Sequence, residues 1–262
     1  MAVITSNHRD VILDAVRAMY TDVATAPGKE FHFPTGRRAC ELVGYPRELL
    51  DQVPSEAVES FAGVGYPFQA GVIRPGDRVL DIGSGSGTDT LIASRLVGPA
   101  GRVIGLDMTA AMRSKLAANV TRATASNVDV LDGNAEAIPL PAAAVDVVTT
   151  NGVINLVPDK AAAFREMYRV LAPGGRVQLA DIVVHVPPSD ACRAQPQLWA
   201  ECIVGAVSEV EYLRLFEAAG FRDVDVLTRH DYFAGSSSAD TRRVAKSFGA
   251  HAFVLRATKP AG

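Results

Sequence analysis

Short apolar runs alternate with longer amphipathic segments from residue 78 to residue 259. Apolar runs bounded by glycine and polar residues predict strands, and apolar residues repeated at helical spacing predict helices. Strands are expected at 79–82, 102–107, 127–131, 145–150, after the turn at 169–176, at 223–227 and at 252–257. Helices are expected at 88–97, 109–123, 159–171 and 208–220, the last opening with the capping box Ser208-Glu209-Val210-Glu211. This alternation predicts an α/β fold with a doubly wound, seven-stranded, mostly parallel sheet.

Two regions lie outside this alternation. Residues 1–77 predict a helical segment, because apolar residues recur on one face at Val11, Ile12, Ala15, Val16, Met19, Tyr20 and Val23. Residues 184–207 are inserted between the fifth strand and the next helix. Ligands of open α/β sheets bind beyond the carboxyl ends of the strands. We therefore expect 1–77 to form a cap and substrate segment, and 184–207 a lid, over a domain that spans 78–262. Residues 235–240 are expected to form a mobile loop.

The composition narrows the class of protein. Of the 262 residues, 48% are hydrophobic and 21% charged, as in ordinary soluble globular proteins. A net charge of -3 gives no basic footprint for nucleic acid. No apolar run has membrane-spanning length and the first residues lack a signal-peptide pattern, so we expect a cytoplasmic protein that binds no membrane. The three cysteines have no C-x-x-C spacing, which argues against disulfides and a structural metal site.

Three glycines at alternate positions, Gly83, Gly85 and Gly87, follow the first predicted strand and precede a helix. Glycine permits positive φ and lets a ligand approach the backbone closely. Dinucleotide-binding proteins use a similar turn, so the glycines alone do not identify the ligand. Asp81 stands two residues before the first glycine, where a carboxylate suits a cationic ligand. Asp107 ends the next strand, where it can accept hydrogen bonds from two ribose hydroxyls.

These features resemble the first motifs of class I S-adenosylmethionine-dependent methyltransferases. Residues 132–139 resemble the family's adenine-contact segment, with Asn134 in place of the usual Asp, and residues 169–176 resemble its R-V-L-x-P-G-G turn. The resemblance implies that S-adenosyl-L-methionine is the cofactor, S-adenosyl-L-homocysteine its product, and the last strand antiparallel. It implies a cofactor site made of Asp81, Gly83, Gly85, Gly87, Asp107, Met108, Asn134, Ala135, Glu136 and Asn151.

Several further stretches resemble the arsenite methyltransferase branch, namely Tyr45-Pro46 and residues 60–68, 103–109, 151–160 and 202–206. Members of that branch carry three cysteines that bind trivalent arsenic, a soft element that thiolates select. At the matching positions this chain has Val64, Gly152 and Cys202, so a single thiol remains. The resemblance implies an acceptor pocket near Val64, Tyr66, Gly152 and Asn155.

The expected activity is methyl transfer to a small, organic acceptor. Alternatives are arsenite methylation with Cys202 as thiolate ligand, a non-catalytic S-adenosylmethionine-binding protein, and a nicotinamide-dependent oxidoreductase using the same glycine turn. Cys202 is a candidate catalytic residue or a small buried residue. His32, between Phe31 and Phe33, is a candidate general base for an oxygen or nitrogen nucleophile, or a packed histidine that holds a loop.

Overall fold

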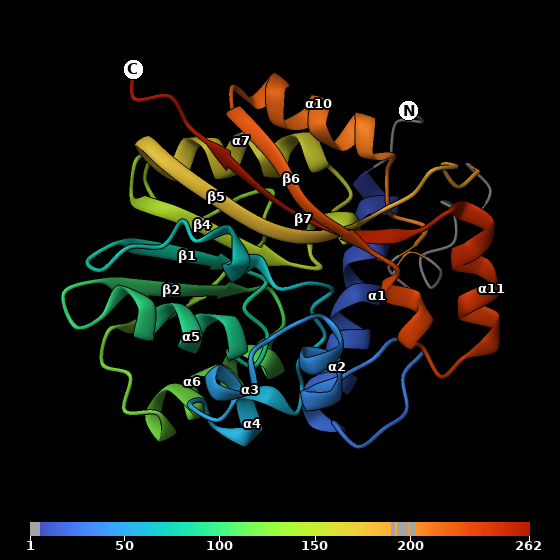
Figure 1. Ribbon diagram of the computed structural model, residues 1–262, viewed down its shortest axis with the longest axis horizontal. Helices are drawn as coiled ribbons and strands as arrows, with labels where there is room; N and C mark the ends of the chain where they lie inside the picture. The colour runs from blue at the N-terminus through green and yellow to red at the C-terminus, as the bar shows by residue number, and fades with distance from the viewer. Residues whose placement is uncertain (1–5, 190–191, 193–198, 200–202) are drawn as a thin grey trace.

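Seven strands form one sheet in the order β3-β2-β1-β4-β5-β7-β6 (Figure 1). The computed structural model describes residues 6–189, 192, 199 and 203–262. The strands from β3 to β5 run parallel, and β7 runs antiparallel to both β5 and β6. The prediction of seven strands with an antiparallel last strand is confirmed. Their bounds are β1 Arg78–Ile82, β2 Arg102–Asp107, β3 Val128–Asp132, β4 Val145–Asn151, β5 Leu171–Val183, β6 Arg222–His230 and β7 His251–Thr258.

Helices cover both faces of the sheet, because adjacent strand residues point to opposite sides. On β1, Val79 belongs to one apolar cluster with Leu91 of α5, whereas Leu80 belongs to another with Phe164 of α7 and Phe216 of α10. Figure 1 shows α7 and α10 on one side and α5 and α6 on the other. The bounds are α5 Thr88–Val97, α6 Ala110–Arg122, α7 Lys160–Val170, α10 Glu209–Ala219 and α11 Ala239–Phe248, with short 3-10 helices η2 Ile154–Leu156 and η3 Tyr232–Gly235.

Capping residues set the helix ends within a residue or two of the predicted limits. Ser208 accepts a hydrogen bond from the Glu211 N–H at the start of α10, as the capping box predicts. Asp159 accepts one from the Ala162 N–H at the start of α7. Gly220 ends α10 in the left-handed region, which glycine adopts without strain.

Two expectations were wrong. The turn at 169–176 is not a separate turn, because β5 begins at Leu171 and the residues before Arg176 bulge out between two paired positions of β4. The expected loop at 235–240 is short, because α11 begins at Ala239. The Ser238 side chain accepts a hydrogen bond from the Thr241 N–H and so caps that helix. A run of glycine and serine favoured a loop, whereas one of its serines is a helix cap.

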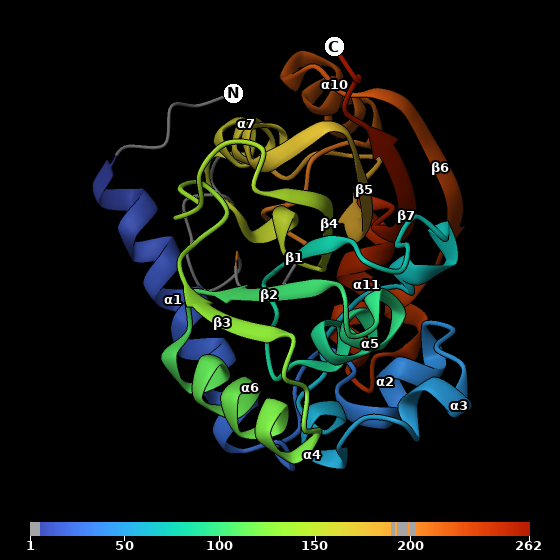
Figure 2. The ribbon, with the colours of Figure 1, turned by 90° about the vertical axis from the view of Figure 1, so that its left-hand side faces the viewer.

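The N-terminal segment contains α1 Ser6–Thr25, α2 Gly36–Leu42, α3 Arg47–Leu50, α4 Ser55–Val58 and η1 Pro67–Ala70. Its buried residues, including Val23 and Leu50, share an apolar cluster with Val79 and Leu91 of the sheet domain. On α1, Ile12 and Val23 are fully buried, but Val11 is 45% exposed, so the apolar face is narrower than expected. Figure 2 shows α1 beside α6 at one edge of the molecule. The division into 1–77 and 78–262 stays a prediction.

Much of the expected lid at 184–207 lies outside the described residues. Val184, at its start, forms a bridge with Ser208. Within the segment, buried Trp199 donates a hydrogen bond to the Leu156 carbonyl at 2.9 Å. The lid function therefore stays a prediction.

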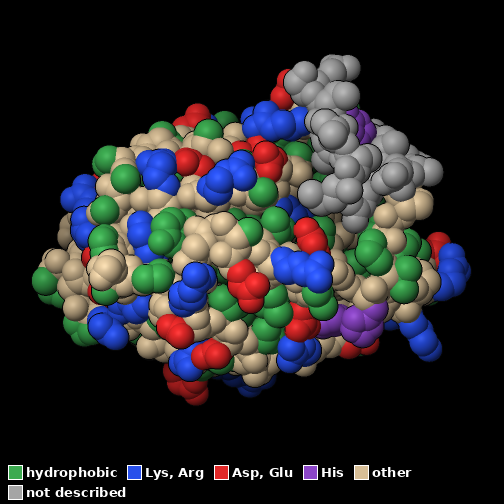
Figure 3. Space-filling view, turned by 90° about the horizontal axis from the view of Figure 1, so that it is seen from above, with side chains coloured by type: hydrophobic (Ala, Val, Ile, Leu, Met, Phe, Trp, Pro, Cys, Tyr) green, Lys and Arg blue, Asp and Glu red, His purple; other side chains and the backbone are tan. Residues whose placement is uncertain are grey.

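The face of the molecule seen in Figure 3 is mixed in charge. In the view of Figure 3, basic and acidic side chains are interspersed with small hydrophobic areas, as is ordinary for a globular domain. Within the described ranges, no helix has the length and apolar character needed to cross a membrane. The expectation that the chain binds no nucleic acid stays a prediction.

Candidate active site

A cavity of about 1030 Å³, open solvent at its mouth included, lies beyond the carboxyl ends of β1, β2 and β4. Of the predicted cofactor residues, all but Gly87 line it. The lining includes Asp81, Gly83, Gly85, Asp89, Asp107, Met108, Asn134, Ala135, Glu136, Asn151 and Gly152.

The three glycines of the turn have different tasks. All have positive φ, with values of 71°, 54° and 101° for Gly83, Gly85 and Gly87. A Cβ on Gly83 would lie 2.3 Å from Val153, and one on Gly87 would lie 2.4 Å from Leu116. A Cβ on Gly85 would meet only the Met112 sulfur, at 3.9 Å. Gly83 and Gly87 therefore permit close packing, whereas Gly85 leaves an open backbone surface toward the cavity.

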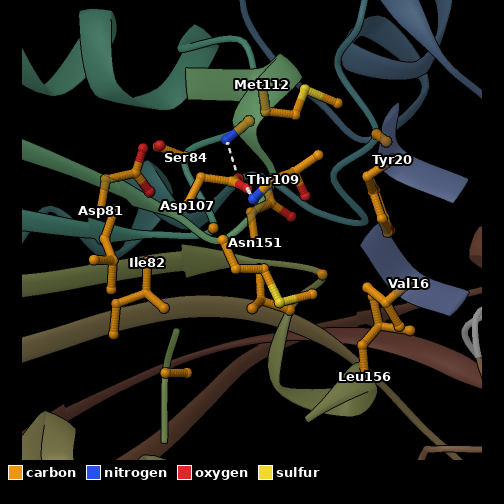
Figure 4. Close-up of a pocket in the computed structure, with 18 of the residues that line it drawn as sticks. Val16, Tyr20, Asp81, Ile82, Ser84, Asp107, Thr109, Met112, Asn151 and Leu156 are labelled. Carbon is orange, nitrogen blue, oxygen red and sulfur yellow. Dashed lines mark hydrogen bonds between the residues drawn. The ribbon is translucent and has the colours of Figure 1, made fainter. Parts of the chain in front are cut away.

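Asp107 is fixed by the backbone around it (Figure 4). Its carboxylate accepts hydrogen bonds from the Gly85 N–H at 2.9 Å and from the Thr109 N–H at 2.8 Å. Burial raises the pKa of Asp107, and these two bonds oppose that rise. A carboxylate has about four acceptor positions, so lone pairs remain for a ligand's hydroxyl groups.

Two further carboxylates lie buried near the glycine turn. Asp81 accepts a hydrogen bond from the Thr90 hydroxyl at 2.6 Å, and burial together with the negative charge of Asp89 raises the pKa of Asp81 to about 8. Burial also raises the pKa of Asp89 to about 6. None of the described lining residues is a lysine, arginine or histidine. A ligand that brings a positive charge would favour the charged form of these carboxylates.

Asp89 and its partner Tyr45 were not predicted as site residues. Asp89 lies in the first turn of α5, and the Tyr45 hydroxyl donates a hydrogen bond to it. The sequence did offer a signal for Asp89, namely an acid two residues after the last glycine. Nothing local marks Tyr45, which comes from a segment 44 residues away.

Asn151, at the end of β4, has an amide side chain whose hydrogen bonds are made within the protein, and its cofactor contact stays a prediction. Its side-chain oxygen accepts hydrogen bonds from the N–H groups of Val64 and Gly65, at 2.8 and 3.2 Å. Its NH2 group donates to the Gly65 carbonyl at 2.9 Å, to Tyr45 at 3.0 Å and to Asp89 at 3.1 Å. Asn151 lines the cavity, but its amide groups hold the 63–65 loop in place.

The segment after β3 is organised in the same way. The Asn134 side-chain oxygen accepts hydrogen bonds from the N–H groups of Glu136 and Ala137, at 2.9 and 3.1 Å. Glu136 accepts hydrogen bonds from the Asp159 N–H at 2.7 Å and from Arg9 of α1 at 2.8 Å. The turn is therefore rigid, and Arg9 ties α1 to it.

The opposite wall is apolar. We call it the α1 side, and it consists of Leu13, Val16 and Tyr20 from α1 with Phe61 and Leu156. We call the wall made by Asp81, Asp89, Asp107 and the glycine turn the strand-end side. Figure 4 shows Asp81 and Asp107 across the cavity from Val16, Tyr20 and Leu156.

Three of the four predicted acceptor-pocket residues are not on the wall. Gly152 lines the cavity, but Val64 is 1% exposed and packs behind it. Tyr66 packs edge-on against Tyr45, with ring centroids 4.7 Å apart. Asn155 is fully buried, and its N–H donates to Asp181 at 2.9 Å. These three side chains are used in packing instead.

Of the two predicted catalytic residues, only His32 belongs to the described part of the chain, and it does not line the cavity. His32 is not a lining residue; its ring lies edge-on to Phe33, its carbonyl accepts a hydrogen bond from Ser236, and burial lowers its pKa. This arrangement matches the alternative of a packed histidine. Cys202 lies outside the described residues. Cys40 is buried away from the lining, and burial raises the pKa of its thiol strongly.

Comparison with known proteins identifies the family to which this fold and cavity belong. A family model described as a methyltransferase domain matches residues 73–220. An arsenite methyltransferase of Halobacterium salinarum is 36% identical over 191 residues, which cover 73% of this chain and 49% of that protein. An arsenite methyltransferase of Rattus norvegicus is 31% identical over 83% of this chain and 62% of its own length. The chain thus spans about half to three fifths of the length of these two relatives.

A solved structure extends the likeness. The arsenic(III) S-adenosylmethionine methyltransferase of Chlamydomonas reinhardtii has a TM-score of 0.64 and 32% identity, covering 87% of this chain and 74% of its own. The [4+2]-cyclase SpnF, at 18% identity and a TM-score of 0.61, shares the fold over 98% of both chains. The chain belongs to the class I S-adenosylmethionine-dependent methyltransferases, and within them it resembles the arsenite methyltransferase branch.

Proposed function

We propose that this protein transfers a methyl group from S-adenosylmethionine to a small organic acceptor and releases S-adenosylhomocysteine. The observation that carries the proposal is the two-sided cavity, with buried carboxylates on the strand-end side and hydrocarbon on the α1 side. The first suits a cationic cofactor, and the second suits an acceptor with a carbon framework.

The strand-end residues fit the parts of the cofactor. Asp107 would accept hydrogen bonds from the ribose hydroxyls, and the rigid turn around Asn134 would meet the adenine. Gly85 offers open backbone for close approach. Asp89 would supply negative charge for the methionine end, and a bound cation there would also favour the charged form of Asp81.

The bound cofactor supplies an electrophilic methyl group, so the protein chiefly has to align the acceptor and exclude water. Leu13, Val16 and Leu156 keep water from that part of the cavity. The 63–65 loop, held by Asn151, fixes the neighbouring wall. A soft nucleophile needs no general base, whereas a hydroxyl or an amine does.

The wall favours an organic acceptor over arsenic. The resemblance assigns thiols to positions 64 and 152, where this chain has Val64 and Gly152, and thiolates are the ligands that trivalent arsenic selects. Arsenite methylation with Cys202 as ligand is the second candidate, favoured by the arsenite methyltransferases among the relatives. A non-catalytic cofactor-binding protein is the third.

Calorimetry and a methyl-transfer assay test the proposal. We expect micromolar binding of S-adenosylmethionine and S-adenosylhomocysteine, and transfer of a labelled methyl group to members of a panel of thiols, phenols and amines. Absence of cofactor binding would refute the proposed function. Binding without transfer to any acceptor would support the non-catalytic alternative.

Arsenite is assayed alongside, with Cys202→Ser and the matched control Cys192→Ser. We expect weak arsenite binding and no arsenic methylation in the wild type. Tight binding and turnover, lost in Cys202→Ser and kept in Cys192→Ser, would establish arsenite methylation instead.

A further inference from the structure

Asp89 is a buried carboxylate that faces the cavity and is held in one orientation. It is 7% exposed, and its two oxygens accept hydrogen bonds from the Tyr45 hydroxyl and from the Asn151 NH2 group. Both partners are themselves fixed: Tyr45 is packed against Phe61 and Tyr66, and Asn151 holds the 63–65 loop. The carboxylate therefore cannot turn away from the cavity without breaking two hydrogen bonds.

The position of Asp89 along the sheet shows which part of the cofactor it meets. The strands follow the order β3-β2-β1-β4 at this edge. Asn134 follows β3 and Asp107 ends β2, and the proposed function has adenine at the first of these places and ribose at the second. A ligand that continues in the same direction reaches the junction of β1 with α5 and the end of β4. Asp89 and Asn151 lie at that place, and the Asn151 Nδ2 atom is 3.1 Å from the Asp89 Oδ2 atom.

The surroundings leave the charge of Asp89 without a basic partner among the described lining residues. The titratable groups that act on it or respond to its charge are Asp81, Cys40, Tyr45 and Tyr66, all acids. A carboxylate in such a site gains most from a ligand that brings its own positive charge.

Resting on the proposed function, we propose that Asp89, positioned by Tyr45 and Asn151, is the counter-ion of the cofactor's sulfonium. S-adenosylmethionine carries one positive charge more than S-adenosylhomocysteine, and that charge is on the sulfur. Asp89 thereby makes the site prefer the methyl donor over the neutral thioether product. Loss of the sulfonium charge in the reaction removes this attraction and favours product release.

The test compares charged and uncharged ligands in matched variants. S-adenosylmethionine, sinefungin and S-adenosylhomocysteine are titrated at pH 8.5 into the wild type, Asp89→Asn and the control Asp225→Asn. Sinefungin carries an amine in place of the sulfonium. Asparagine keeps the shape of Asp89, removes its charge and can accept one of its two hydrogen bonds through the amide oxygen. Asp225 pairs with Arg256 at the surface of β6.

We expect Asp89→Asn to lower the binding affinity for S-adenosylmethionine and sinefungin by about tenfold or more, which is the usual contribution of a charge-assisted contact. The affinity for S-adenosylhomocysteine should fall much less. Asp225→Asn should bind all three like the wild type. An equal loss for S-adenosylmethionine and S-adenosylhomocysteine would overturn the assignment while leaving the proposed function intact. No binding of either ligand by the wild type would overturn both.

A measurement on the wild type keeps the proposal testable if Asp89→Asn does not fold. Binding enthalpies at pH 6 in buffers of different ionisation enthalpy give the number of protons released. A sulfonium beside Asp89 favours its charged form, so S-adenosylmethionine should release more protons than S-adenosylhomocysteine. Equal proton release by the two ligands would contradict the proposal.

Discussion

The strand-end side and the α1 side of the cavity respond to charge in opposite ways. The strand-end side gathers three desolvated carboxylates, each held by neighbouring hydrogen-bond donors and with none of the described cavity-lining residues basic. The α1 side presents Leu13, Val16 and Leu156, which offer contact area and no charge. Burial of the carboxylates on the strand-end side lowers the stability of the fold, and binding of a cationic ligand offsets this loss. The α1 side adds to the stability of the fold without any ligand.

This difference teaches where selectivity resides. Carboxylates at strand ends select for charge and for hydroxyl groups in fixed positions, and small displacements there change affinity strongly. A hydrocarbon wall selects for size and shape, with only about 1–3 kcal/mol for each methylene gained or lost. We therefore expect a strict preference for the cofactor and a broader one for the acceptor.

The largest expected effect is on the strand-end side. Asp107→Ala removes the predicted ribose contact and frees two backbone N–H groups, so affinity for S-adenosylmethionine should fall by about 1.5–3 kcal/mol. The matched control is Asp132→Ala, because Asp132 is the register partner of Asp107 on β3 but is 71% exposed and does not line the cavity. Calorimetric titration checks both variants. Equal affinity of Asp107→Ala and the wild type would show that ribose is not bound there.

The second prediction uses pH to measure the titration of the strand-end side, because the apolar residues of the α1 side do not titrate. A raised carboxyl pKa means that the folded state keeps a proton that the unfolded state has released, so stability falls as pH rises toward the folded value. The pKa of Asp81 is raised to about 8. Burial lowers the pKa of His32 and His230, so these two histidines act in the opposite sense and add stability as pH rises.

Between pH 6.5 and 8, the ligand-free protein should therefore lose about 2 kcal/mol of unfolding free energy, at about 1.4 kcal/mol for each pKa unit. Urea denaturation at the two pH values measures this loss. Asp81→Asn removes the titrating group and should flatten the dependence. A stability that rises over this range in the wild type would contradict the assignment.

The smallest effect concerns the α1 side. Arg9 links α1 to Glu136, whose side chain is 5% exposed, but Arg9 itself is 36% exposed. Solvent screening limits such a pair to less than about 1 kcal/mol. Arg9→Gln should therefore weaken cofactor affinity only slightly and increase hydrogen exchange in the first turns of α1. Arg17→Gln, which breaks the exposed pair with Asp14, is the control and should change neither.

The parts of the molecule that were predictable carry local signals. The glycine turn with Asp81, and Asp107 at the end of a strand, are encoded within a few residues, and all of these residues except Gly87 line the cavity. The α1 side forms only when α1, which is distant in sequence from the strand ends, packs against the rest of the domain. The apolar face of α1 therefore predicted that the helix is buried, but not which residues it packs against. Tyr45 and Asn151 meet only in the folded chain, 106 positions apart in sequence. The resemblance implied that Val64 borders the pocket. In the structure Val64 is buried behind Gly152, which lines the cavity.

The contact between Val64 and Gly152 has a consequence for how such proteins diverge. A Cβ at position 152 would lie 3.2 Å from a γ-carbon of Val64, and Gly152 has a φ of 72°. Cysteine has one γ-atom where valine has two, so a change at position 64 makes room for a side chain at 152. A lineage that gains thiols here therefore meets a preferred order, with 64 changing before 152. For a lineage that loses the thiols, the favoured order is the reverse, with position 152 changing before position 64. The two positions are therefore coupled through their packing.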